Sequence, residues 1–101
     1  MEPGVNPPGT PLTSEEIIEK GGYASAILGN ETLMEFFRDE LERIKTAMCN
    51  TLPDEGKHRS NLYYQHYGVT EFLRSLAAYK DAAEETLAQL EAEQYEQKEV
   101  D

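Results

Sequence analysis

The chain has 101 residues, with twenty acidic and nine basic side chains and a formal net charge of −11 at pH 7. That length allows one small domain, and the acidic balance disfavours duplex DNA, whose phosphates would repel the chain as a whole. The single cysteine, Cys49, excludes an intramolecular disulfide and fits a reducing cytoplasm. No apolar run approaches the roughly 20 residues of a membrane span, and the first residues lack the pattern of a secretory signal peptide.

Residues 1–12 contain four of the five prolines in the chain. Proline fixes φ and restricts the residue before it, so we expect an extended, disordered arm here. The alternative is an arm that becomes ordered when it docks on a partner. The folded domain is expected over residues 13–95.

A first helix is predicted over residues 14–28. Thr13 and Glu16 have the T-x-x-E spacing of a capping box, and apolar residues recur on one broad face. Gly21 and Gly22 interrupt this pattern at a cost of about 2 kcal/mol relative to two alanines. Either the helix bends at the glycines or the backbone of another helix approaches them closely.

A second helix is predicted over residues 31–52, with Asn30 as its N-cap. Apolar residues at alternating spacings of three and four form a seam along it: Met34, Phe37, Leu41, Ile44 and Met48. Pro53 disfavours helical geometry at the residue before it. The LPDEG segment, residues 52–56, therefore indicates a tight turn.

A third and much longer helix is predicted over residues 57–95, followed by an acidic tail at 96–101. So short a turn makes the second and third helices antiparallel neighbours. We therefore predict an all-α fold, an antiparallel helical hairpin with a long C-terminal helix plus a shorter N-terminal helix. From about Tyr79 onward the apolar stripe of the long helix extends past the second helix. It needs cover from the first helix, a second copy or a partner protein.

Charge is distributed unevenly along the long helix. Residues 57–80 carry four basic side chains and one acidic one, whereas residues 81–101 carry eight acidic side chains and one basic one. Acidic surfaces favour solubility or docking on a basic partner.

The most distinctive segment is KHRSNLYYQHY, residues 57–67. Basic side chains interleaved with tyrosines allow three interpretations. They could pack within the hairpin, form a protein-binding hot spot, or stack on single-stranded nucleic acid. The net charge argues against the third interpretation, so direct binding of nucleic acid is not expected. We predict partner-binding residues in this segment and farther along the helix: Arg59, Tyr63, Tyr64, Tyr67, Arg74, Leu87 and Leu90.

No catalytic or metal-binding pattern is present in the sequence. His58 and His66 are eight positions apart with no close pair of carboxylates beside them, and a zinc site needs three or four convergent ligands. Cys49 has no defined base and adjoins the seam residue Met48, which favours an inert thiol. There is no phosphate-binding glycine loop and no HExxH motif. We expect a protein that is not an enzyme and uses no cofactor.

One run of motifs resembles a known group of proteins. It reads G-x-A-x-x-I-L-G-N-E from Gly22 to Glu31, then Phe36-Phe37, then D-E-G-x-H-R from Asp54, and then F-L-x-x-L from Phe72. This run resembles small helical proteins encoded near the portal and terminase genes of tailed bacteriophages. The resemblance implies an accessory protein of the virion or of its assembly, located in the host cytoplasm or in the particle, and without catalysis of its own.

Two functions are therefore expected from the sequence. The first is a protein–protein interaction module in a phage particle, with a protein partner, self-association, or both. The alternative is an acidic inhibitor or regulator that occupies a basic, nucleic-acid-binding surface of another protein. Residues 81–101 would supply its acidic face.

Overall fold

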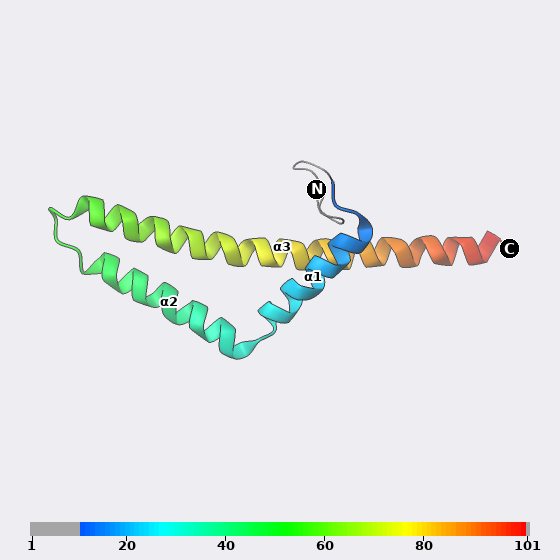
Figure 1. Cartoon of the computed structure of the whole chain (residues 1–101), viewed down its shortest axis with the longest axis horizontal. Coiled ribbons are helices and arrows are strands. Elements are labelled where there is room, and N and C mark those ends of the chain that lie inside the picture. The colour runs from blue at the N-terminus through cyan, green and yellow to red at the C-terminus, as the bar shows by residue number, and fades with distance from the viewer. Residues whose placement is uncertain (1–10, 101) are drawn as a thin grey trace, which may run out of the picture.

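The computed structural model describes residues 11–100, with side chains as far as Glu96. This part of the chain forms three helices and no strand: α1 (Ser14–Leu28), α2 (Glu31–Cys49) and α3 (Gly56–Val100). In Figure 1, α3 is a long, nearly straight rod, and α1 and α2 together close a triangle on one side of it. The predicted all-α class, with a long C-terminal helix and a shorter N-terminal one, is confirmed.

The N-termini of the first two helices are capped by the residues that the sequence indicated. The Thr13 side chain accepts a hydrogen bond from the backbone N–H of Glu16, and the Glu16 carboxylate accepts one from the Thr13 N–H, which completes the capping box. The Asn30 side chain accepts a hydrogen bond of 2.9 Å from the backbone N–H of Leu33. Each bond satisfies a donor that the first turn of a helix leaves without a partner.

The ends of α2 and α3 differ from the predicted bounds. α2 stops at Cys49 rather than at residue 52, because the Thr51 hydroxyl donates to the Met48 carbonyl and the chain turns there. α3 continues past the predicted end at residue 95 to Val100, so the acidic tail predicted at 96–101 is helical as far as it is described. The arm predicted at residues 1–12 lies mostly outside the described residues.

Gly21 is a packing contact and not a break in α1. α1 is continuous through both glycines, and Gly21 is buried against α3. A Cβ atom placed at Gly21 would lie 2.7 Å from the carbonyl oxygen of Tyr79 and would overlap the Cβ of Ala83. Only glycine therefore allows this approach of the two backbones. Gly22 faces open space.

The arrangement is not the simple hairpin that the short turn predicted. α2 runs back along α3 but diverges from it away from the turn, and α1 crosses from the far end of α2 onto the middle of α3 (Figure 1). The side chains explain the difference. Gly21 and Ala24 let α1 settle closely on α3, whereas the rings of Phe37 and Phe72, with centroids 6.1 Å apart, lie between α2 and α3. Large side chains at a helix contact increase the distance between the axes.

The molecule is extended and its core is small. Its radius of gyration is 20.1 Å, against about 13 Å for a compact domain of this length. The buried apolar side chains of the described residues are Ala24, Ile44, Leu62, Leu76 and Ala83. A single layer of helices can bury only one side of each helix, so much apolar surface stays exposed. No helix in the described range is long and apolar enough to cross a membrane.

Candidate protein-interaction surfaces

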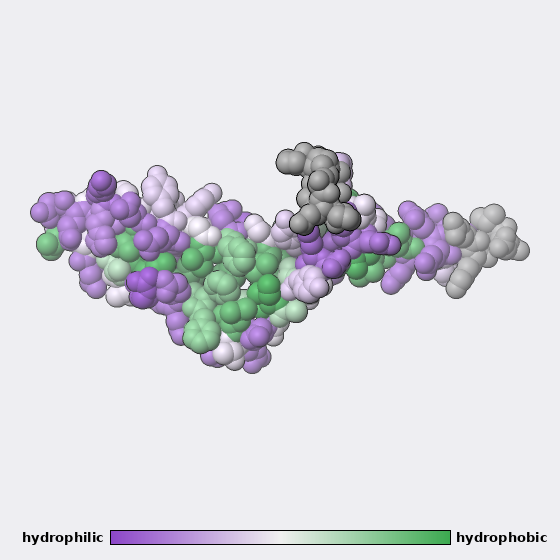
Figure 2. Space-filling model, in the orientation of Figure 1, coloured by the Kyte–Doolittle hydropathy of each residue, from purple (hydrophilic) through white to green (hydrophobic). Residues whose placement is uncertain are grey.

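An apolar hollow lies between α2 and α3, away from the turn. It has a volume of about 380 Å³ and is lined by Leu33, Phe36, Phe37, Glu40 and Val69. We call it the phenylalanine hollow. Figure 2 shows apolar residues gathered on this face of the molecule, between the rod of α3 and the corner where α1 meets α2. The hollow exists because α2 diverges from α3 and nothing fills the space between them.

Two phenylalanines, one that lines the phenylalanine hollow and one beside it, are unusually exposed. Phe36 keeps 67% of its surface accessible, and Phe72, whose ring is tilted against that of Phe37, keeps 50%. Burying an aromatic side chain of this size is worth about 1.5–3 kcal/mol relative to leaving it in water. Exposed apolar patches with a polar rim are typical of protein-binding sites.

One charged side chain, Glu40, lines the phenylalanine hollow and forms an ion pair within α2. The Arg43 guanidinium lies 2.5 Å from Glu40, one helical turn away. The hydrogen bond from Arg43, together with its positive charge, lowers the pKa of the Glu40 carboxyl below its usual value. The same bond raises the pKa of Arg43. Glu40 therefore stays a carboxylate at the edge of the hollow at neutral pH.

The tyrosine cluster of α3 forms a second exposed surface. Tyr63, Tyr64 and Tyr67 keep 56%, 68% and 54% of their surfaces accessible. Tyr63 contacts both of the others, with ring centroids 5.7 Å from Tyr64 and 6.5 Å from Tyr67. Tyr63 thus stacks on Tyr67 and meets Tyr64 edge to face, and all three rings lie at the surface and not in the buried core.

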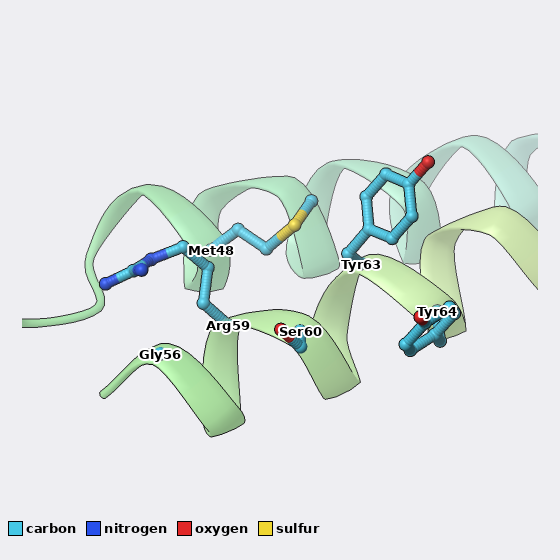
Figure 3. A pocket seen from close by; sticks show the side chains of 6 residues that line it. All are labelled: Met48, Gly56, Arg59, Ser60, Tyr63 and Tyr64. Atoms are coloured by element: carbon cyan, nitrogen blue, oxygen red, sulfur yellow. The ribbon is translucent and has the colours of Figure 1, made fainter. Parts of the chain in front are cut away.

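A shallow pocket adjoins the tyrosine cluster at the turn end of the molecule. Its volume is about 300 Å³, and its lining residues are Met48, Gly56, Arg59, Ser60, Tyr63 and Tyr64. In Figure 3 the Met48 side chain extends from α2 toward the ring of Tyr63, whereas the Arg59 side chain extends toward the turn. The pocket is open, and its walls are mainly apolar.

Arg59 belongs to the turn as much as to the pocket. Its guanidinium donates one hydrogen bond of 2.8 Å to the Thr51 hydroxyl and another of 2.8 Å to the Leu52 carbonyl. Glu55 adds a third contact, since its carboxylate accepts from the Leu52 N–H at 2.7 Å. These hydrogen bonds hold the turn after α2 against the start of α3. Arg59 therefore has a structural role in the turn, and its predicted role as a partner contact would come in addition to it.

The other predicted contact residues lie farther along α3. Arg74 is exposed and pairs with Glu71 at 2.5 Å. Leu87 keeps 43% of its surface accessible, and Leu90 is half-buried. Arg74, Leu87 and Leu90 lie away from the tyrosine cluster, so the structure does not bring the seven predicted residues into one site. Their role in binding stays a prediction.

Sequence reasoning missed the phenylalanine hollow. In the sequence, Phe36 stood out only in the Phe36-Phe37 pair and Phe72 only in the F-L-x-x-L motif. Both lie beside apolar neighbours in the sequence, which is typical of core positions. Their exposure depends on the divergence of α2 from α3, and no periodicity within either helix indicates it.

The described residues hold no group of three or more His, Cys, Asp or Glu side chains that could bind a metal ion. Cys49 is free and exposed on the last turn of α2. Over residues 11–96, no buried side-chain nitrogen or oxygen atom lacks a hydrogen-bond partner. Comparisons with protein-family models, with curated proteins and with solved structures found no match to this chain.

Proposed function

We propose that this chain is a non-catalytic protein-interaction module and that the phenylalanine hollow is its main docking surface. The observation that carries this proposal is an apolar hollow lined by the exposed ring of Phe36, with the half-exposed ring of Phe72 beside it against Phe37, in a chain with a small core. The best-fitting partner element is an apolar helix or segment of another protein. Such a segment would fill the space between α2 and α3 and complete a second layer of packing.

A photo-crosslinking amino acid at Phe36 tests this proposal in the cell that produces the protein. We expect one discrete adduct with a different protein. The control is the same amino acid at Tyr23, which is similarly exposed at 66% but lies on α1. Phe72→Ser in the same chain should abolish the Phe36 adduct. Adducts at Tyr23 alone, or an adduct that contains two copies of this chain and nothing else, would contradict the proposal.

The biological setting that we propose is a tailed-phage particle or its assembly, in the host cytoplasm or the virion. Its support is the motif run from Gly22 to Leu76, which resembles small proteins encoded beside phage portal and terminase genes. The neighbouring genes provide a direct test. Portal and terminase genes should flank this one, and a chromosomal operon free of phage genes would refute the setting.

One observation favours the alternative function, an acidic inhibitor or regulator. Five acidic side chains in the second half of α3 are exposed: Glu84, which lies beside α1, and Glu85, Glu91, Glu93 and Glu96. Beyond α1 the rod continues with no other described helix beside it (Figure 1). A single acidic rod could enter a basic nucleic-acid channel of another protein. Binding would then fall steeply with salt. Alanine at Glu84, Glu85 and Glu91 should abolish it, and unchanged binding would exclude this function.

A further inference from the structure

α3 has a long exposed face turned away from its buried residues, and α2 borders this face only at the Tyr64 end, where Met48 lines the same pocket. The residues that pack inward are Leu62, Leu76 and Ala83. Residues on the opposite side of α3 recur at spacings of three and four, as in a coiled-coil seam. We call them the outer face: Tyr64, Tyr67, Glu71, Arg74, Ala78, Asp81, Glu85, Ala88, Ala92 and Tyr95. All are exposed except Glu71, which is half-buried beside Arg74.

Charge indicates what can cover the outer face. Residues 57–80 carry four basic side chains and one acidic one, whereas residues 81–96 carry six acidic side chains and no lysine or arginine. A second α3 placed parallel to the first would set acidic half against acidic half. Placed antiparallel, it sets the basic half of each copy against the acidic half of the other. We propose that a second copy of this chain packs on the outer face, with the two α3 helices antiparallel.

One register makes the facing side chains complementary. When Ala78 of one copy faces Asp81 of the other, Arg74 faces Glu85 across the interface. The same register places Tyr67 opposite Ala92, so a large side chain meets a small one. At the centre of the seam the small residue Ala78 borders a hollow of about 320 Å³, whose other lining residues, Ser75, Tyr79 and Ala82, lie to one side of the outer face. Two backbones can approach closely at such a place.

The same register also matches the ends of the outer face. Tyr64 of one copy faces Tyr95 of the other, and these rings keep 68% and 65% of their surfaces accessible in the single chain. Tyrosine is enriched at protein interfaces because it combines apolar area with a polar tip. Ala88 faces Glu71, so no two like charges meet directly along the seam. The interface is two-fold symmetric, because every contact occurs twice.

The exposed area is sufficient for such a dimer. The accessible surface of the chain is 8145 Å², which exceeds the roughly 5,800 Å² of a compact monomer of this mass by about 2,400 Å². A standard interface removes about 800 Å² from each partner. The excess is larger than this requirement, as expected for so extended a chain.

Light scattering across a concentration series, combined with a charge exchange, tests the dimer. The wild type should approach twice 11.4 kDa as concentration rises. Arg74→Glu alone and Glu85→Arg alone should each raise the dissociation constant at least about tenfold, and the double variant should restore dimerisation. The two residues lie about 16 Å apart along one helix, so restoration requires contact between copies. Lys45→Glu makes the same change of charge on the exposed side of α2 and should leave the dimer intact.

Disulfide trapping tests the direction of pairing, in chains that carry Cys49→Ser. Copies with Tyr67→Cys mixed with copies with Ala92→Cys should give a mixed disulfide dimer on a non-reducing gel. Tyr67→Cys copies alone should stay monomeric on the gel. A wild type that is monomeric at every concentration, or cross-linking of Tyr67→Cys copies to themselves, would overturn the proposal. Circular dichroism confirms that each variant is helical. The phenylalanine hollow lies on a different surface, so this proposal and the proposed function can fail separately.

Discussion

At the scale of single residues, the two adjacent glycines of α1 have opposite roles. Gly21→Ala would push a methyl group into Ala83 and the backbone of Tyr79. We expect it to lower the free energy of unfolding by about 1–3 kcal/mol, the usual cost of overpacking. Gly22→Ala meets nothing within 4 Å. It should raise stability by about 0.5–1 kcal/mol, because alanine is the better helix former.

Thermal unfolding followed by circular dichroism measures this difference between the glycines. The two variants differ only in which of two neighbouring residues carries the methyl group, so each is the control for the other. Adding Ala83→Gly to Gly21→Ala should recover part of the lost stability. The second change removes the Cβ of Ala83, which the new methyl group at residue 21 would otherwise overlap. Equal melting temperatures for Gly21→Ala and Gly22→Ala would mean that α1 does not sit on α3 as described.

Arg59 provides a second prediction at this scale, because its two hydrogen bonds join the end of α2 to the start of α3. Arg59→Ala should cost about 1.5–3 kcal/mol in chemical denaturation, the range for hydrogen bonds that involve a charged group. Lys57→Ala removes the same charge two residues earlier and should stay within about 0.5 kcal/mol of the wild type. Equal stability of the two variants would show that the turn does not depend on Arg59.

The Glu40–Arg43 pair predicts a pH dependence at the edge of the phenylalanine hollow. The pKa of the Glu40 carboxyl is lower in the folded chain than the ordinary pKa of a glutamate, because Arg43 donates a hydrogen bond to it and carries a positive charge. The folded state therefore binds this proton less readily than the unfolded state does. The contribution to stability is present above the unfolded pKa and is lost as the pH falls through the folded pKa.

Carboxyl titration by NMR measures this pKa directly. In Arg43→Ala the pKa of Glu40 should rise toward its ordinary value, because the hydrogen bond and the positive charge are both lost. Arg38→Ala removes a charge from the same helix without touching this pair, and it should leave the Glu40 pKa unchanged. An unchanged Glu40 pKa in Arg43→Ala would show that the pair does not persist in solution.

At the scale of elements, the helix starts are set by local chemistry. Asn30 accepts the backbone N–H of Leu33 through its side chain, which fixes where α1 ends and α2 begins. Asn30→Ala should therefore cost about 1 kcal/mol in thermal unfolding, whereas Asn30→Ser should be nearly neutral because serine also caps well. A serine variant as unstable as the alanine variant would assign the loss to something other than the cap.

The helices could be predicted from the sequence because their signals are local. The capping box at Thr13, the cap at Asn30 and the turn before Gly56 each depend on residues a few positions apart. The end of α2 was placed three residues too late, since Thr51 bonds back to Met48 and closes the helix before Pro53 acts. The end of α3 was placed too early, because a polar, acidic sequence continues a helix as well as an apolar one does.

The arrangement of the helices could not be predicted in the same way. The close contact of α1 with α3 depends on Gly21 meeting Ala83, which lies 62 positions later in the chain. The sequence allowed a bend or a contact at the glycines, and only the structure separates the two. The phenylalanine hollow follows from the resulting divergence of α2, so its exposed rings had the pattern of ordinary core residues.

At the scale of the whole molecule, support for α3 is uneven along its length. The middle of the rod packs against α1 and the first half against α2, whereas beyond Leu87 the rod has no other described helix beside it (Figure 1). An isolated helical segment of about ten residues is marginal in water. In a dilute monomer the backbone amides of residues 88–96 should therefore exchange with solvent much faster than those of residues 69–83.

Hydrogen exchange at two protein concentrations tests whether pairing through the outer face stabilises the end of α3. If α3 pairs with a second copy, residues 88–96 lie against the basic half of that copy and their exchange should slow as concentration rises. Arg74→Glu should keep their exchange fast at both concentrations, because it weakens the pairing without touching these residues. Slow exchange of residues 88–96 that is independent of concentration and of Arg74 would instead show that the single chain stabilises the end of α3 by itself. The end of α3 would then be stable without a second copy packed on the outer face.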